Sequence, residues 1–311
     1  MRDFSGWRDW AIRGRAITMA VVAVLVGSVA ACLAEAPSPR LATVNGHPVF
    51  QRDVDLELLI SGSRQPTPVD QEAALERVID RTLVAKFVAT KGIDPLAEDV
   101  ENLLLRLRRG IESGEDSFEA VLGRLKLTEA DVRQAAQLSV SWQAYVGRTL
   151  TDQEIREYFE SHREQFDGTR VRIRQIVRAI PASGTPAEWD EAQKLLASLH
   201  PQIKAGQIEF AAAAAAHSTS PSGKTGGDVG LIRYRGDVLA PLAVAAFALK
   251  PGEVSLPIRS AVGVHLVQTT ERVAGELSLE DARPAVRSEL GEQLWLKTVK
   301  ALRAKAKIMR E

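Results

Sequence analysis

Few residues of this 311-residue sequence combine a chemically useful side chain with a useful spacing. Ser222-Gly223-Lys224-Thr225 resembles the end of a phosphate-binding loop, but such a loop needs glycine where Ser218 stands. No Gly-x-Ser-x-Gly string occurs in the chain, so a serine hydrolase has no support. A metal site has none either, because Cys32 is the only cysteine and the histidines lack metal-ligand spacing: His47, His162, His200, His217 and His265.

The most specific pattern is a series of short strings in the second half of the chain. The strings are Gly226-Gly227-Asp228-Val229-Gly230, Phe247-Ala248-Leu249-Lys250-Pro251-Gly252-Glu253 and Gly263-Val264-His265. In this order and separation they resemble the parvulin family of peptidyl-prolyl cis-trans isomerases over about residues 169–272. Residues 42–49 are similar to the start of SurA/PrsA-type extracytoplasmic chaperones, a weaker resemblance that covers most of the chain.

The reaction that this resemblance implies is rotation about an X-Pro amide bond, whose resonance barrier is about 18 to 20 kcal/mol. No covalent bond breaks, so the site needs no strong nucleophile. It must seat the proline ring in an apolar pocket, exclude water and offer polar groups that favour the twisted amide over the planar one.

The resemblance assigns the polar side of the site to Gln175, Ser220 and His265. His265 matches a family histidine, whereas Gln175 stands where active members usually carry a second histidine and Ser220 where they usually carry Asp or Cys. A glutamine amide can still hydrogen-bond to His265, but a neutral Ser220 contributes no carboxylate or thiolate field. The two departures leave open a site of reduced activity.

The same resemblance assigns the proline pocket to Val238, Leu242 and Phe247. Val238 and Leu242 stand where Met and Phe are common, so we expect a shallower and less aromatic pocket. Judged from the residues alone, two other readings stay open. His265 could be a structural histidine of a strand, and Phe247 could be an ordinary core residue.

The N-terminus has the pattern of an export signal. Arginines at positions 2, 8, 13 and 15 precede the uncharged stretch 16–34. The stretch runs into Val29-Ala30-Ala31-Cys32, which resembles a bacterial lipobox, so we expect a lipoprotein-type signal peptide over 1–32, lipidation of Cys32 and a tether over 33–40. The protein would then be extracytoplasmic, on the periplasmic side, and held to a membrane by lipid. A transmembrane helix and an unmodified thiol are the alternatives.

The elements that must position the site form an α+β unit over 168–273. Alternating residues at 171–177 predict a half-buried strand, and Thr185-Pro186-Ala187-Glu188 predicts the start of a helix that runs to Ala205. Further strands are expected at 228–234, 254–258 and 264–270, with a short helix at 241–249 between them. These elements make a compact α+β unit, and the resemblance implies that it is the small antiparallel sheet with helices of a parvulin-like domain.

Helical patterns flank this unit on both sides. An Asn45-Gly46 hairpin opens an otherwise helical module over 41–165, in which Thr128 with Asp131 and Thr151 with Glu154 mark helix starts. A long amphipathic helix follows within 276–311 and must bury its apolar face, for which the N-terminal module is the available partner. The predicted fold class is therefore α+β, a parvulin-like domain inserted in an all-helical chaperone module built from both ends of the chain.

The balance of charges argues against one class of partner. The 40 Lys and Arg residues balance 40 Asp and Glu residues, so a nucleic-acid partner has little support. Two hypotheses follow: a prolyl isomerase that assists the folding of exported polypeptides, or a holdase that binds unfolded or Pro-containing segments without turnover. Neither needs a cofactor.

Overall fold

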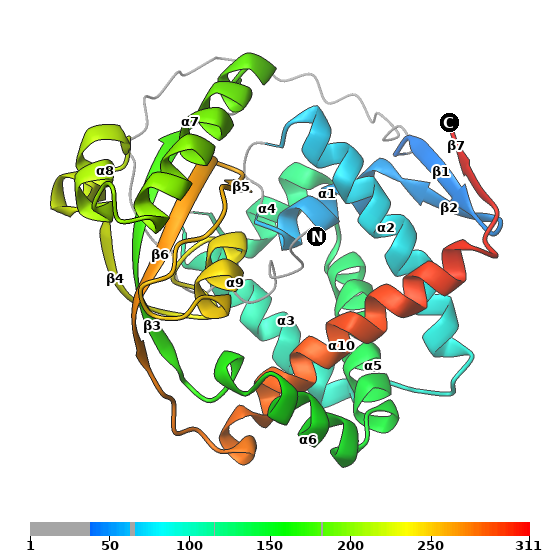
Figure 1. The fold of residues 1–311 in the computed structure, drawn as a ribbon. Helices are drawn as coiled ribbons and strands as arrows, with labels where there is room; N and C mark the ends of the chain where they lie inside the picture. The colour runs from blue at the N-terminus through cyan, green and yellow to red at the C-terminus, as the bar shows by residue number, and fades with distance from the viewer. Residues whose placement is uncertain (1–37, 63–65, 115, 182) are drawn as a thin grey trace. The chain divides into compact units, whose positions relative to one another are not determined.

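The computed structural model describes residues 38–62, 66–114, 116–181 and 183–311 (Figure 1). The chain divides into two compact units, Met1–Leu150 with Glu289–Glu311, and Thr151–Ser288. Cys32, the predicted signal peptide and most of the predicted tether lie outside the described residues. Within the described ranges, we find no helix of the length and apolar character needed to cross a membrane.

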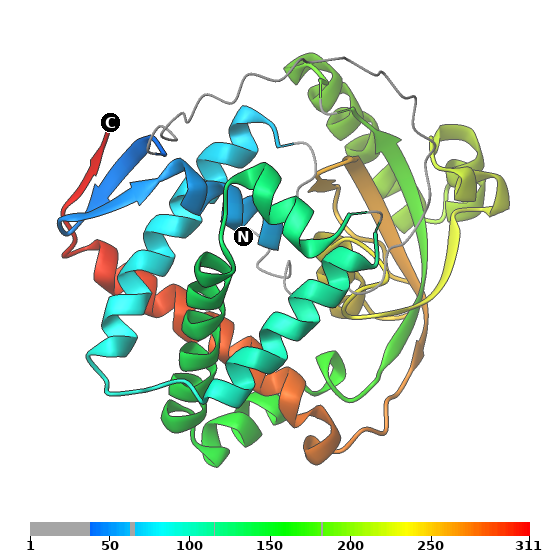
Figure 2. The same ribbon diagram turned by 180° about the vertical axis from the view of Figure 1, so that it is seen from behind.

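The first unit is mainly helical and carries a three-stranded sheet of order β2-β1-β7 (Figure 2). Its elements are β1 (Arg40–Val44), β2 (His47–Phe50), α1 (Gln51–Ile60), α2 (Pro68–Ala89), α3 (Ala97–Glu112), α4 (Phe118–Leu125), α5 (Glu129–Thr149), the later part of α10 (Leu279–Arg303) and β7 (Ile308–Arg310). The predicted hairpin is confirmed, because β1 and β2 pair antiparallel around Asn45 and Gly46, both with positive φ.

Segments from the two ends of the chain share the core of this unit. Val299 of α10 is buried in one cluster with Val84 of α2 and Trp142 of α5. Trp142 and Trp295 meet edge to face with ring centroids 5.0 Å apart. Strand β7 pairs antiparallel with β1, which ties the C-terminus to the first strand. The α+β class predicted from the sequence is confirmed.

The second unit contains a four-stranded antiparallel sheet of order β4-β3-β6-β5. Its elements are α6 (Asp152–Ser161), η3 (Arg163–Gln165), β3 (Arg170–Ala179), α7 (Pro186–Lys204), α8 (Phe210–His217), η4 (Pro221–Thr225), β4 (Asp228–Arg233), α9 (Ala240–Ala248), β5 (Ile258–Ser260), β6 (Gly263–Val273) and the first turns of α10.

Helices cover both faces of this sheet. Alternate residues of β3 and β6, such as Ile176 and Leu266, pack against α7 and α8. The residues between them, such as Ile173 and Val267, pack against α9. The sheet therefore separates two apolar clusters, one on each face.

One predicted strand is misplaced. Residues 254–258 do not form a strand, because only Val254 makes a bridge, with Gln268, and the observed strand β5 begins at Ile258. Pro257 has no N–H to give to a ladder, which favours a break just before Ile258.

Candidate functional site

His265 lies in the middle of the second unit, on β6, with only 3% of its surface exposed. Its Nε2 atom lies 2.7 Å from the Ser260 hydroxyl, whereas its Nδ1 atom is buried and has no hydrogen-bond partner among the described residues. Burial lowers the pKa of this imidazole. Burial therefore favours the neutral ring, in which one nitrogen is hydrogen-bonded to Ser260 and the other has no hydrogen-bond partner among the described residues.

Gln175 faces the same side of the sheet as His265. In the register of β3 and β6, Val177 is opposite His265 and Gln175 is opposite Val267. Residues two apart on a strand share a face, so Gln175 and His265 are diagonal neighbours, about 7 to 8 Å apart. Both belong to the face that α9 covers, and Gln175 is half-buried.

Ser220 lies in a loop that extends the sheet along the free part of β3. Val177 N donates to Ser218 Oγ at 3.1 Å, and Thr219 N donates to the Val177 carbonyl at 2.8 Å. The loop therefore runs beside Val177 on one side, while His265 pairs with Val177 on the other. The Ser220 hydroxyl is half-buried and lies 3.1 Å from that of Ser222. The three predicted polar residues thus occupy three adjacent segments at one end of the sheet.

The Gly-Gly-Asp string holds this loop against β3. Gly227 has φ +83°, and a Cβ there would lie 2.5 Å from the Gln175 carbonyl oxygen, so only glycine allows the approach. In return Gln175 N donates to the Gly227 carbonyl at 2.8 Å. Asp228 pairs with Arg172 at 2.7 Å, and the hydrogen bond from the Arg172 guanidinium lowers the pKa of the Asp228 carboxyl.

The predicted pocket residues gather in one apolar cluster on the same face. Leu242 is 3% exposed among Ile173 and Val267, and Val238 and Phe247 are half-buried at the margin of this cluster. The Phe247 ring meets Tyr234 edge to face at 5.1 Å.

Helix α9 contacts both β6 and β5. Thr269 of β6 donates to the Ala246 carbonyl at the end of α9, and Thr269 lies four residues beyond His265, about 13 Å along the strand. The helix also packs against β5, in which Ile258 pairs with His265.

Sequence reasoning missed Ser260, Thr269 and Arg272. Each acts through a partner that is distant in sequence or across a turn, and none belongs to a distinctive string. The register of the β5–β6 hairpin, had it been assigned, would have placed Ser260 next to His265.

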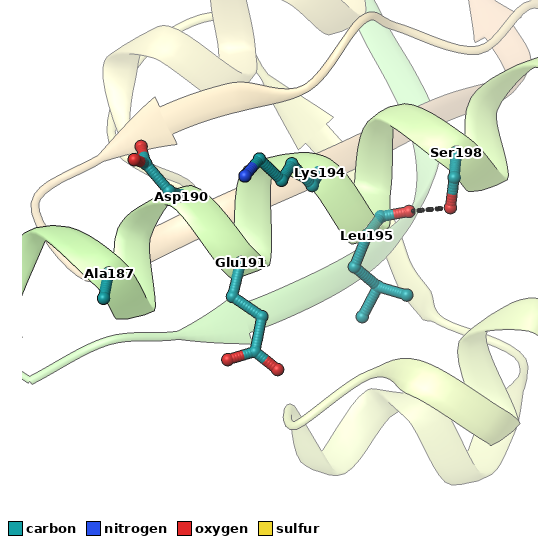
Figure 3. Close-up of a pocket in the computed structure, with 6 residues that line it drawn as sticks. All are labelled: Ala187, Asp190, Glu191, Lys194, Leu195 and Ser198. Carbon is teal, nitrogen blue, oxygen red and sulfur yellow. Dashed lines mark hydrogen bonds between the residues drawn. The ribbon is translucent and has the colours of Figure 1, made fainter.

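A shallow groove of ≈ 630 Å³ lies along one side of α7 (Figure 3). It is lined by outward-facing residues such as Asp190, Glu191 and Lys194, whereas Leu196 and Leu199 of the same helix point into the core cluster. The lining residues of the groove all belong to α7 and include none of the predicted site residues, so the groove is not part of this site.

Comparisons with known proteins identify the unit. Residues 176–271 match the family described as "Rotamase: PPIC-type PPIASE domain". The chain is 34% identical over 245 residues to Chaperone SurA of Nitrosospira multiformis, covering 70% of this chain and 54% of that protein. It is 36% identical over 138 residues to Chaperone SurA of Chromohalobacter salexigens, covering 44% of this chain and 30% of that protein. The crystal structure of PrsA from Bacillus anthracis aligns with TM-score 0.45 and 18% identity, covering 74% of this chain and 96% of that one.

Residues 176–271 are therefore a PPIC-type rotamase domain, of the parvulin class of peptidyl-prolyl isomerases. Over a longer stretch, the chain that carries this domain is similar in sequence to SurA chaperones. It spans about half the length of the Nitrosospira relative, and less of the Chromohalobacter one.

Proposed function

We propose that this protein is a peptidyl-prolyl cis-trans isomerase that assists the folding of exported polypeptides. The observation that carries the proposal is the buried His265, hydrogen-bonded to Ser260 and on the same sheet face as Gln175 and the apolar cluster under α9. The family of residues 176–271 supports it.

The chemistry rests on which state of the amide the site favours. When an X-Pro bond twists, the nitrogen loses its conjugation and becomes a hydrogen-bond acceptor, while the carbonyl oxygen loses negative charge. Donors aimed at that nitrogen therefore bind the twisted amide more tightly than the planar one. In our proposal Gln175, Ser220 and His265 provide this polar environment, with the Gln175 amide and the Ser220 hydroxyl as neutral donors.

The proline ring would rest on the apolar residues of the same face. Leu242 is the buried pocket residue of this cluster, with Val238 and Phe247 at its margin. Seating the ring there expels water from the amide, so that the polar groups act in a medium of lower dielectric.

We further propose that the protein works outside the cytoplasm, lipid-anchored at Cys32 on the periplasmic side of a membrane. The basic N-terminus, the uncharged stretch and the small residues before Cys32 support this proposal. The helical module of residues 41–165, with the helix within 276–311, would offer unfolded chains a second binding surface. Growing cells with a labelled lipid precursor tests the anchor, since a Cys32→Ala variant that is labelled as strongly as the natural chain contradicts it.

A holdase without turnover is the second candidate. It is favoured by Gln175 and Ser220, neither of which has the titratable side chain usual at its position in the family.

A refolding assay separates the two functions. The test protein should have a slow refolding phase that is limited by X-Pro isomerisation. An isomerase accelerates this phase at substoichiometric concentration, and His265→Ala removes the acceleration while the suppression of aggregation persists. A holdase suppresses aggregation only near stoichiometric amounts and leaves the slow phase unchanged, and that result would reject the isomerase proposal.

A further inference from the structure

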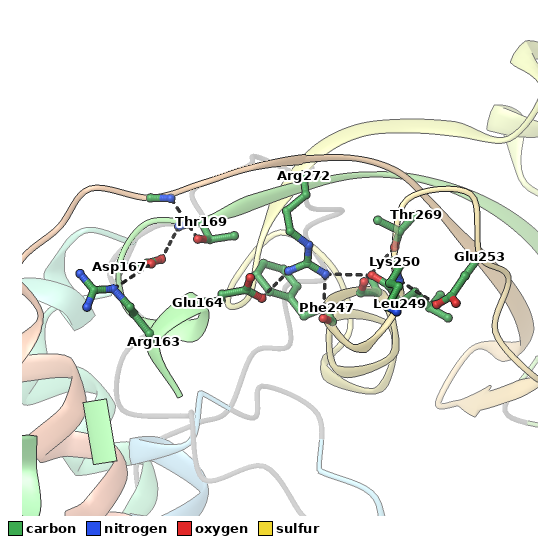
Figure 4. A network of polar contacts seen from close by, with 12 residues as sticks. Arg163, Glu164, Asp167, Thr169, Phe247, Leu249, Lys250, Glu253, Thr269 and Arg272 are labelled. Carbon is green, nitrogen blue, oxygen red and sulfur yellow. Dashed lines mark hydrogen bonds and ion pairs between the residues drawn. The ribbon is translucent and has the colours of Figure 1, made fainter. Parts of the chain in front are cut away.

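Arg272, near the end of β6, makes contacts that connect the strand to the end of α9 (Figure 4). Its Nη2 atom donates to the Phe247 and Leu249 carbonyl oxygens, each at 2.9 Å. Its Nη1 atom forms an ion pair with Glu164 of η3. The guanidinium carbon lies 5.8 Å from the centre of the Phe247 ring, so one side chain contacts both the backbone and the ring of Phe247.

The end of α9 needs such donors. The last carbonyls of a helix have no partner within the helix, and α9 ends at Leu249 in an extended conformation, with no basic residue in its last turn. Two side chains of β6 donate here. Thr269 Oγ1 donates at 2.8 Å to the Ala246 carbonyl, which also accepts from Leu249 N, and Arg272 donates to the Phe247 and Leu249 carbonyls. A cation at this end also interacts favourably with the helix dipole.

The strand that provides both contacts is the strand that carries His265. Thr269 and Arg272 therefore fix where α9 stands along β6, and with it the distance between Leu242 and the imidazole. Packing alone fixes this position weakly, since α9 is nine residues long and most of its side chains are alanine.

We infer that Arg272, with Thr269, is a positioning residue of the prolyl-isomerase site: it holds the helix that forms the apolar pocket in register with the polar residues of the sheet. Arg272 touches no substrate in this account and acts only through α9. The effect expected on KM rests on the isomerase function proposed above. The effect expected on the stability of α9 does not.

The test uses the full chain and three variants. Arg272→Lys keeps the charge but loses the fork that reaches two carbonyls. Glu164→Gln keeps the fork and removes the ion pair. Arg283→Lys is the matched control, because Arg283 forms its ion pairs with Asp152 and Glu280 of the same unit and not with α9.

Two measurements are made on each variant. Amide hydrogen exchange within α9 should be about tenfold faster in Arg272→Lys, with exchange in β6 unchanged, and should change by less than about threefold in the other two variants. Isomerisation of a proline tetrapeptide should show KM raised about tenfold in Arg272→Lys with kcat within about twofold, because the polar residues are untouched.

The outcomes are distinct. Exchange in α9 that is as slow in Arg272→Lys as in Arg283→Lys overturns the positioning role, whatever the turnover. A fall in kcat with KM unchanged also overturns it, since the pocket would then not be what Arg272 sets. Faster exchange in α9 together with no turnover in the natural chain keeps the positioning role and rejects the isomerase function instead.

Discussion

Replacing Gly227 by alanine should destabilise the second unit more than an ordinary glycine substitution does. An L-residue at φ +83° costs about 1 to 2 kcal/mol in backbone strain. The new Cβ would also lie 2.5 Å from the Gln175 carbonyl oxygen and 3.2 Å from the Ala214 Cβ. Neither can move freely, because Gln175 N is bonded to the Gly227 carbonyl and Ala214 is fully buried. Overpacking of this kind adds about 1 to 3 kcal/mol, for a total of about 2 to 5 kcal/mol.

Gly206→Ala is the control that separates strain from overlap. Gly206 has φ +70°, but a Cβ there would meet nothing within 4 Å, so only the strain of about 1 to 2 kcal/mol applies. Urea unfolding followed through NMR amide signals of residues 168–273 measures both variants. Equal losses of stability would refute the reasoning that Gly227 exists for the close approach of the loop to β3.

Two further predictions concern His265. Ser260→Ala should destabilise this unit by about 1 to 3 kcal/mol, because it leaves the second nitrogen of the buried ring without a partner. Ser198→Ala removes an exposed hydroxyl that bonds only within α7 and should change stability by under about 0.5 kcal/mol. Similar losses in the two variants would be evidence against this prediction. Because burial lowers the pKa of His265, the unfolded chain binds a proton that the folded chain does not, so stability is complete above about pH 6.5 and falls as the pH drops below it. Denaturant unfolding between pH 7.5 and 5.5 should show this fall, and a fall of the same size in His265→Gln would contradict the assignment.

The helix starts were predictable because they depend on local chemistry. Thr151 and Glu154 illustrate this: Glu154 N donates to Thr151 Oγ1 at 3.2 Å, and Thr151 N donates to the Glu154 carboxylate at 2.8 Å. Both partners lie within one turn, so the pattern carries its own geometry. The capping box at Thr185 and Glu188 is confirmed in the same way.

Elements that depend on distant partners were not predictable. Strand β7 is three residues long and exists only because it pairs with β1, at the other end of the chain. The strand expected at 254–258 was misplaced for the same reason, since pairing with β6, a separate strand, decides where β5 begins.

The same distinction holds for the site residues and the contacts that position them. The positions of Gln175, Ser220 and His265 followed from strings of the family, and their roles stay proposals. The hydrogen bonds that hold His265 and α9 could not be read from the sequence, because Ser260 and Arg272 reach their partners only once β6 has paired with its neighbours and α9 has packed on it.

Catalysed cis-trans exchange of a proline-containing tetrapeptide, measured by NMR with the full chain, tests the isomerase site most directly. The account predicts acceleration by catalytic amounts of the natural chain, a loss of at least about tenfold in His265→Ala, and equal or faster exchange in Gln175→His. No acceleration by the natural chain, or acceleration that His265→Ala leaves intact, would contradict it.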